Sequence, residues 1–247
     1  MDEIVKLLFE LASIERLLLL LCIDAEPKRL SDISRELEIT TPEVYRQLNR
    51  LTNQSIVNKT SDGLYEITPY GRLILQSLDL FKFLTKHRDF ILNHDLMVIP
   101  VEFIHRLGEL NECEVVEGVY RIIKIQEKYM AETESRLWTM SRQIFHLVFP
   151  VLEKLGDKSV DIRLILPESI TATQQFKKLK QTGGQFVRFL PEVNFVLGVL
   201  DDGGGICFPT LEGKIDMSYM IGCINPISYN WLVDLHSYYW EKAEPLY

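Results

Sequence analysis

The hydrophobic positions between Leu30 and Thr68 predict two short helices followed by two strands. Ile33 and Leu37 lie four residues apart in RLSDISRELEI, which places them on one face of a first helix. The apolar residues of a second helix repeat at helical spacing: Val44, Leu48 and Leu51. Strand-forming residues then occupy 55–60 and 64–68, on either side of a Ser-Asp-Gly turn whose glycine can adopt the positive φ of a tight hairpin.

Residues with special roles at helix ends mark the limits of both helices. Ser31 can cap the free amides of the first helix, and a turn follows at Glu38–Ile39. Thr40 or Thr41 can cap the second helix. Pro42 then lies at the first helical position, where an N–H group would have no partner within the helix. Helix, turn, helix and hairpin in this order are typical of a winged helix-turn-helix.

The polar side of the second helix and the hairpin carry residue types that contact phosphates and base edges. The residues that we expect to contact DNA are Thr41, Glu43, Tyr45, Arg46, Asn49, Arg50, Asn58 and Lys59. A second interpretation stays open, because protein-interaction modules share the winged fold without binding nucleic acid.

The segments ITTPEVYRQLNRLTNQSIVNK and GLYEITPYGR resemble the winged helix of ArsR-like and related archaeal and bacterial transcription regulators. The resemblance covers about the first third of the chain. It implies a sequence-specific regulator of transcription that binds double-stranded DNA.

The charge balance limits the electrostatic part of DNA binding. The chain of 247 residues has a net charge of −8, and residues 1–75 carry nine Lys and Arg against twelve Asp and Glu. The sign reverses between residues 40 and 60, where Arg46, Arg50 and Lys59 stand against Glu43 alone. Because affinity for a duplex depends on cations that displace counterions from phosphate, we expect a homodimer, which doubles these contacts, and strongly salt-dependent binding.

Two further helical patterns flank the winged helix. Residues 2–23 read as one helix with too many apolar positions for a single face, so part of it is expected to pack against another subunit. A second long helix covers 69–91, and its mixed faces fit a dimer stalk and a core helix equally. We therefore predict a DNA-binding domain at 1–75, a connector or dimerisation helix at 70–94 and an effector or regulatory domain at 95–247.

Beyond residue 95, strand patterns alternate with helix patterns, which is typical of an α/β domain with a mostly parallel or mixed sheet. The predicted strands are 113–118, 160–167, 185–191, 195–200, 206–209 and 216–222. The predicted helices are 119–145, which includes Leu137 and Trp138, 170–183, which Gly183 closes, and 226–243. The fold class is thus a two-domain α/β chain with an N-terminal winged helix.

A second resemblance covers residues 95–247. The segments VIPVEFIHRLGELNECEVVEG, FPVLEKLG, VDIRLILP, GKIDMSYMIG and NWLVDLHSYYWEKAEP resemble the effector domain of archaeal methanogenesis regulatory proteins and kindred archaeal winged-helix regulators. That family has a Trp followed by a Leu-x-x-Tyr helix, which is Trp231, Leu235 and Tyr238 here. The resemblance implies an archaeal origin and a domain distantly similar to phospholipase-D-like sheets.

The motifs of several enzyme classes are missing from the sequence. A phospholipase-D-type site needs His-x-Lys and a serine hydrolase needs G-x-S-x-G, and neither occurs. The run Gly203 to Gly205 lacks the Lys-Ser/Thr of a phosphate loop and fits a flexible hairpin turn. We therefore expect no enzyme activity and no cofactor.

Metal and disulfide chemistry is not expected either. The four cysteines, Cys22, Cys113, Cys207 and Cys223, lie far apart and form no CxxC motif, which argues against a zinc site and a disulfide framework. Asp201 and Asp202 could hold a metal ion, but adjacent acidic residues in a glycine turn are usually only solvated.

Two arginines in apolar strands could belong to a ligand site. Arg163 and Arg188 could pair with an anionic ligand in a crevice, or could face solvent from a twisted strand. We expect the domain to sense a small-molecule effector or a protein partner, with a ligand placed between the sheet and the final helix.

The sequence contains no membrane signal. The apolar run 17–23 is seven residues long, whereas a membrane-spanning helix needs about 20 residues. The chain opens with Asp2 and Glu3 instead of the basic stretch of a signal peptide. We expect a cytoplasmic protein.

Overall fold

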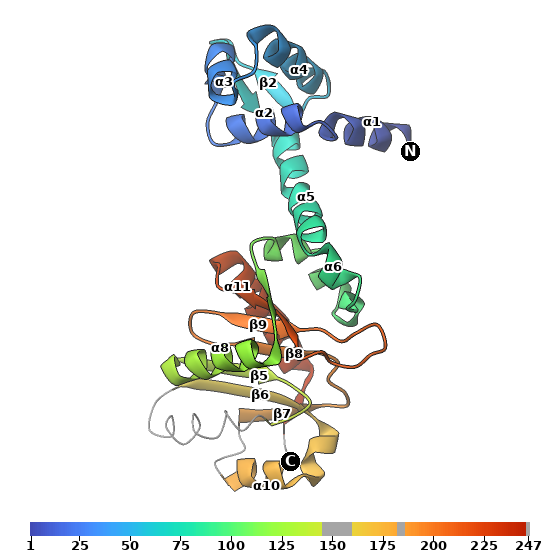
Figure 1. Cartoon of the computed structure of the whole chain (residues 1–247), viewed down its shortest axis with the longest axis vertical. Helices are drawn as coiled ribbons and strands as arrows, with labels where there is room; N and C mark the ends of the chain where they lie inside the picture. The colour runs from blue at the N-terminus through green and yellow to red at the C-terminus, as the bar shows by residue number, and fades with distance from the viewer. Residues whose placement is uncertain (145–159, 182–185, 246–247) are drawn as a thin grey trace. The chain divides into compact units, whose positions relative to one another are not determined.

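The computed structural model describes residues 1–144, 160–181 and 186–245 (Figure 1). The chain divides into two compact units, Met1–Leu78 and Asp79–Tyr247. The division falls inside one continuous helix, α5 (Pro69–Lys86), so residues of the predicted connector belong to both units. Among the described helices, none is long and apolar enough to cross a membrane.

The N-terminal unit consists of helices and a three-stranded antiparallel sheet. Its elements are α1 (Asp2–Leu11), α2 (Ile14–Asp24), β1 (Lys28–Arg29), α3 (Leu30–Leu37), α4 (Thr41–Asn53), β2 (Val57–Lys59) and β3 (Leu64–Ile67), with strand order β1-β3-β2. The pair α3 and α4 followed by the β2–β3 hairpin confirms the predicted winged helix-turn-helix.

The prediction of one helix over residues 2–23 is wrong. The helix breaks at Ala12 and Ser13, and α2 starts anew at Ile14. Ser13 has an extended backbone, and its hydroxyl accepts a hydrogen bond from the amide of Arg16 at 3.4 Å. A serine N-cap in the middle of an apolar run therefore ends one helix and begins the next.

The core of the N-terminal unit contains the apolar residues that the helical spacing selects. Ile33, Val44, Leu48 and Leu51 are each 0% exposed. They pack with residues of α2 and of the hairpin: Leu19, Leu20, Ile23, Ile56, Tyr65 and Ile67. Gly63 turns the hairpin with φ +80°, as the sequence predicts.

Short helices connect α5 to the sheet of the C-terminal unit. They are α6 (Arg88–Ile91), η1 (Leu96–Val98), α7 (Val101–Ile104) and η2 (Leu107–Leu110). The second half of α5 lies so close to η2 that a Cβ at Gly108 would be 2.7 Å from the amide nitrogen of Leu80. Glycine at this position therefore permits the contact between the two helices.

An eight-stranded mixed sheet forms the centre of the C-terminal unit. Its strands are β4 (Glu114–Glu117), β5 (Arg136–Met140), β6 (Asp161–Pro167), β7 (Val187–Leu190), β8 (Val196–Val199), β9 (Gly204–Cys207), β10 (Tyr219–Cys223) and β11 (Glu244–Pro245). The order is β11-β7-β6-β5-β8-β9-β10-β4. Only β5, β6 and β7 run parallel, and the other pairs are antiparallel.

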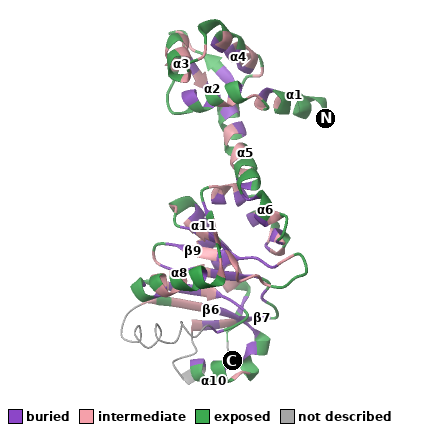
Figure 2. Ribbon diagram, in the orientation of Figure 1, coloured by how far each residue is buried: buried purple, intermediate pink, exposed green. Residues whose placement is uncertain are grey.

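Helices cover both faces of this sheet. One face carries α8 (Val119–Glu132), η3 (Glu168–Ala172) and α10 (Gln174–Gln181), and the other carries α11 (Pro226–Lys242). Side chains alternate between the faces, so that Leu137 packs with α10 while Trp138 packs with α11. The α11 side holds the larger buried core, and Figure 2 shows the buried positions along these strands.

The prediction of a helix from 119 to 145 is wrong beyond Glu132. Leu137 and Trp138 belong to β5, and Phe145 lies outside the described residues, as does Gly183. The carboxylate of Asp201 accepts hydrogen bonds from the amides of three consecutive residues: Glu134, Ser135 and Arg136. These bonds satisfy amides that a continuing helix would have used, and they direct the chain into a strand.

Arg163 and Arg188 lie on the α11 face, half-buried against indole rings. The guanidinium of Arg163 is 4.0 Å from the ring centre of Trp138 and 5.6 Å from that of Trp240. Arg188 lies 4.5 Å from Trp240 and donates to its main-chain oxygen. Arg136 stacks on Trp138 at 4.4 Å. Cations and indoles thus alternate across this face.

All four cysteines are buried and none is in a disulfide. Cys113 and Cys223, which the sequence separates by more than a hundred residues, face each other across β4 and β10 with their sulfur atoms 2.6 Å apart. Among the described residues, no cluster of three or more His, Cys, Asp or Glu side chains is placed to hold a metal ion.

Candidate nucleic-acid interface

Helix α4 has one face in the core and one face in solvent. Thr40 is the N-cap residue and Pro42 lies in the first turn. Val44, Leu48 and Leu51 anchor the buried face, as predicted. Gln47 also lies on this face and is 6% exposed, although its side chain is polar.

The turn between α3 and α4 is fixed by side-chain hydrogen bonds. Glu38 takes a left-handed conformation with φ 56°, which ends α3. The hydroxyl of Ser34 donates to the main-chain oxygen of Ile39 at 2.7 Å and lies 3.2 Å from the hydroxyl of Thr41. Ser34 therefore links the end of α3 to the first turn of α4.

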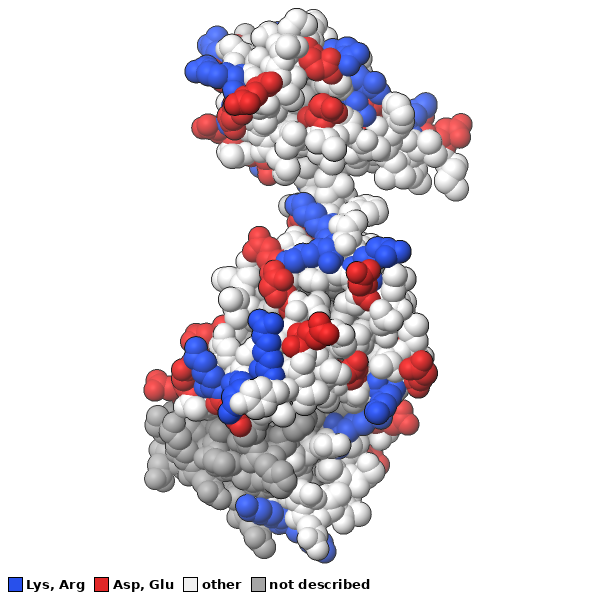
Figure 3. Space-filling model, viewed as in Figure 1, with Lys and Arg blue, Asp and Glu red and all other residues white. Residues whose placement is uncertain are grey.

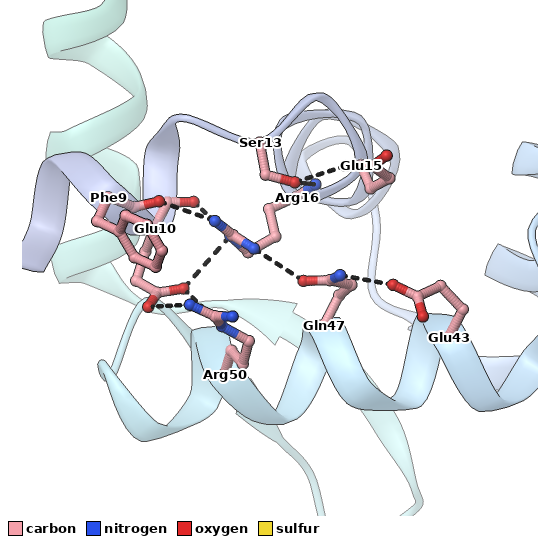
Figure 4. Close-up of polar contacts among 8 residues, drawn as sticks. All are labelled: Phe9, Glu10, Ser13, Glu15, Arg16, Glu43, Gln47 and Arg50. Atoms are coloured by element: carbon pink, nitrogen blue, oxygen red, sulfur yellow. Dashed lines mark hydrogen bonds and ion pairs between the residues drawn. The ribbon is translucent and has the colours of Figure 1, made fainter.

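A polar network joins α4 to α1 and α2 (Figure 4). Arg16 of α2 donates to the main-chain oxygens of Phe9 and Glu10 and, at 2.9 Å, to the side-chain oxygen of Gln47. Gln47 in turn donates to Glu43 at 2.6 Å. The buried polar groups thus satisfy one another, and the bonds fix the rotation of α4 about its axis.

Arg50, which is also predicted to contact DNA, belongs to the same network, and its side chain is 41% exposed. Its guanidinium donates to both carboxylate oxygens of Glu10, at 3.0 and 2.7 Å, and lies 5.4 Å from the ring of Phe9 (Figure 4). These hydrogen bonds hold the pKa of Glu10 below its ordinary value of 4.5. The fork of Arg50 is therefore occupied within the protein.

Arg46 is the exposed cation of α4. Its side chain is 70% exposed and donates to Glu43 at 2.8 Å. This hydrogen bond and that from Gln47 lower the pKa of Glu43. Because an exposed pair one helical turn apart is weak, a phosphate or a base edge can replace the carboxylate as the partner of Arg46.

The other predicted residues lie on α4 and on strand β2. Thr41 and Tyr45 are exposed on α4, where Asn49 is half-buried. Asn58 and Lys59 are exposed on β2, and the Lys59 ammonium lies 5.4 Å above the ring of Tyr65. The helix and the wing thus each present polar side chains to solvent.

Few basic side chains of the N-terminal unit lie outside an ion pair with a carboxylate. In residues 1–78, which are all described, the Lys and Arg side chains outside any ion pair are Arg29, Lys59 and Arg72. On the face shown in Figure 3, basic and acidic side chains alternate over this unit. Phosphate contacts are therefore limited, as the sequence charge indicates.

The sequence prediction did not include several polar residues that lie near α4 or are exposed on the N-terminal unit. Arg29 and Arg72 are exposed cations outside the helix-turn-helix pattern, at β1 and in the first turns of α5. Arg16 contacts Gln47 of α4, 31 positions further on, and Glu10 contacts Arg50 of α4, 40 positions further on. No local spacing in the sequence signals such a contact.

Solved structures resemble the chain at low identity. TrmBL2, an archaeal chromatin protein described as showing a novel mode of DNA binding, is 14% identical over 99% of both chains, with a TM-score of 0.46. IdeR of T. acidophilum is 14% identical over 85% of this chain and 97% of its own, with a TM-score of 0.22. The riboflavin-analogue dimethyltransferase RosA from Streptomyces davawensis is 12% identical over 76% of this chain and 64% of its own, with a TM-score of 0.29. Likeness at this level transfers no function.

A sequence family matches the N-terminal unit. Residues 15–59 match the family described as bacterial regulatory protein, arsR family, and this stretch covers α2, α3, α4 and β2. No curated protein sequence matches the chain at a significant level. The chain therefore carries an ArsR-type winged helix-turn-helix, the domain of a DNA-binding transcription regulator.

Proposed function

We propose that this protein is a sequence-specific, dimeric transcription regulator whose C-terminal unit senses an effector. The observation that supports DNA recognition best is the exposed polar side of α4, with Arg46 at its centre, inside an ArsR-type fold. In a helix-turn-helix the second helix enters the major groove, where a guanidinium can read a guanine through two hydrogen bonds.

The Arg46→Ala change should weaken binding to a selected DNA duplex by about 5- to 150-fold, the equivalent of about 1–3 kcal/mol for a base-reading contact. The matched control is Arg35→Ala. Arg35 lies on α3, is 77% exposed and pairs with Asp32 at the same spacing of three residues. Fluorescence anisotropy on duplexes selected from a random pool measures both affinities.

The proposal that the Arg46 side of α4 faces DNA is wrong if the Arg46→Ala and Arg35→Ala variants bind DNA with equal affinity and both keep the thermal stability of the wild type. Absence of any DNA binding by the wild-type chain favours the alternative function, a winged-helix module that binds protein. The observation in favour of that alternative is that both arginines of α4 are already paired with carboxylates of the protein.

The proposed dimer is supported by apolar side chains in solvent. Ile4 and Phe9 of α1 are 58% and 62% exposed, and Leu73 and Phe81 of α5 are 67% and 53% exposed. Exposed apolar side chains on both helices are the kind of surface that an interface between subunits covers.

Sedimentation equilibrium at about 50 µM subunits should show a dimer for the wild-type chain. Ile4→Glu or Phe81→Glu should weaken the dimer at least tenfold, because each places a charge in an apolar contact. Tyr120→Glu, at a 75% exposed position of α8, serves as control and should leave the mass unchanged. A wild-type monomer at this concentration contradicts the dimer.

We infer that the C-terminal unit acts by binding and not by catalysis. Besides the missing motifs, this inference is supported by His236, which is 0% exposed and stacks between Trp138 and Trp240 in the core. The segments quoted above further support a distant kinship with archaeal methanogenesis regulatory proteins and a phospholipase-D-like ancestry of the sheet.

A further inference from the structure

Three glycines lie side by side across the sheet of the C-terminal unit. Gly198 of β8 pairs with Gly205 of β9, and Gly205 pairs with Gly222 of β10. The row continues to Thr139 of β5 at one end and to Glu114 of β4 at the other. Because glycine weakens the interior of a strand, three of them in one transverse row call for a reason other than sheet stability.

This row is the floor of a cavity of about 370 Å³ that α8 covers. Residues of α8 form the roof: Ile125, Gln126, Lys128, Tyr129 and Met130. The long sides are mostly apolar, with Val196, Cys207 and Met220 along one and Leu200 along the other. The cavity lies on the face opposite α11, whereas the sequence led us to expect a ligand beside the final helix.

The glycines leave this space open where other side chains would fit. A Cβ at Gly198 would meet no described atom within 4 Å, and at Gly222 it would meet Val116 at 3.7 Å, an ordinary contact. Gly205 differs, because a Cβ there would be 2.6 Å from the sulfur of Met220. Packing therefore explains Gly205, whereas at Gly198 and Gly222 the glycine leaves space in the cavity that a side chain could fill.

The Cys207 thiol and the Thr139 hydroxyl, both in the lining of the cavity, have no hydrogen-bond partner among the described residues. The Cys207 thiol is 2% exposed, and its sulfur forms no hydrogen bond with any described residue. Burial raises the pKa of Cys207 to about 12, so the group is uncharged. The hydroxyl of Thr139 likewise lacks a described partner. A ligand in the cavity can satisfy both groups.

The charged groups at the opposite end of the row are already occupied. Glu114 pairs with Lys86 at 2.8 Å, and Glu112 accepts a hydrogen bond from Asn225 at 2.7 Å. Burying an unpaired charge in an apolar cavity is strongly unfavourable. Lys128 of the α8 roof is exposed, so its ammonium stays in solvent. The buried part of the lining therefore selects against a charged group of a ligand.

We propose that this cavity binds one slender, uncharged, mostly apolar molecule that lies along the glycine row with a hydrogen-bonding group at Thr139. Five strands span about 19 Å at the usual strand separation, which fits an extended aliphatic chain. The inference deepens the proposed sensing function, since Glu114 at the end of the row is tied to Lys86, the last residue of α5. Binding itself does not depend on that function.

The test uses the full chain and the uncharged fluorescent probe N-phenyl-1-naphthylamine. We expect saturable binding at one site per chain, displacement by 1-dodecanol, and at least tenfold weaker displacement by dodecanoate. Gly198→Val and Gly222→Val should each weaken probe binding at least tenfold, because a Cβ at either position makes no contact shorter than 3.7 Å and the added methyl groups occupy the floor. Their midpoints of thermal unfolding should stay equal to that of the wild type or rise, which shows that they fold.

Ile123→Ala is the matched control. Ile123 lies on α8, is 39% exposed and does not line the cavity, so its loss should leave probe binding unchanged. The site is refuted if the wild type does not bind the probe, if folded valine variants bind as the wild type does, or if Ile123→Ala weakens binding equally. Equal displacement by dodecanoate refutes the uncharged class of ligand. If the probe binds but 1-dodecanol does not change the affinity for DNA, the cavity is a binding site that has no sensing role.

Discussion

Glu10→Ala should destabilise the N-terminal unit by about 3 kcal/mol, near the lower limit for removing one partner of a buried ion pair. Glu10 is 8% exposed and accepts from Arg50, and its carboxylate lies 3.3 Å from Arg16. Without it, Arg16 remains buried but keeps hydrogen bonds to Gln47 and to main-chain oxygens, which limits the loss.

The three tryptophans all belong to the C-terminal unit, so their fluorescence does not report on this change. Hydrogen exchange of peptides from α1 and α4 measures it directly. Glu3→Ala is the control, because Glu3 lies on the same helix, is 84% exposed and pairs with Lys6. An exposed pair contributes less than about 1 kcal/mol. Equal protection of α4 in both variants would contradict the stabilising role of the network.

His236→Phe should remove a large part of the pH dependence of the stability of the C-terminal unit. His236 is 0% exposed, stacks on Trp138 at 5.2 Å between ring centres, and lies near Arg136, Arg163 and Asp161. Burial, opposed by a weak contact with the Thr139 oxygen and aided by the arginines, lowers the pKa of His236 from 6.5 to about 3.

The sign of the effect follows from where the proton binds. Below pH 6.5 the unfolded chain binds a proton at His236 and the folded chain does not, so acid favours unfolding until the pH reaches the folded pKa. Between pH 6.5 and 4 the loss is about 3 kcal/mol, at 1.36 kcal/mol per pH unit. Phenylalanine keeps the aromatic stack but does not titrate.

Urea unfolding followed by tryptophan fluorescence at pH 7, 6, 5 and 4 measures this difference. The wild type should lose stability more steeply than His236→Phe. His105→Asn, at an exposed histidine, should behave as the wild type does. Parallel curves for the wild type and His236→Phe would show that the folded chain binds a proton at His236 as readily as the unfolded chain does.

Local spacing predicted the elements of the N-terminal unit but not the partners of its polar residues. The repeat of Val44, Leu48 and Leu51 was sufficient to place α4 and its buried face. The same repeat places Arg50 towards solvent, yet Glu10 binds it from another helix. A contact across 40 positions depends on the folded arrangement, which periodicity does not contain.

The C-terminal unit shows the same limit at two places. The apolar pattern of α8 continues through Leu137 and Trp138, and only the carboxylate of Asp201, 65 positions further on, explains why the helix ends before them. The run Gly203 to Gly205 reads as a flexible turn, but its last two residues belong to β9. The role of Gly205 in the cavity floor emerges only from its register with Gly198 and Gly222.

The alternation of guanidiniums and indoles on the α11 face restricts which basic residue can occupy position 163. Arg163 lies within 6 Å of two indole rings, those of Trp138 and Trp240, and pairs with Asp161 at 3.0 Å. A planar guanidinium can stack on a ring while its edge donates hydrogen bonds, whereas the ammonium of lysine is a compact, strongly hydrated point charge. Lysine would keep the charge but lose the stacking, so the two basic residues are not interchangeable at this position.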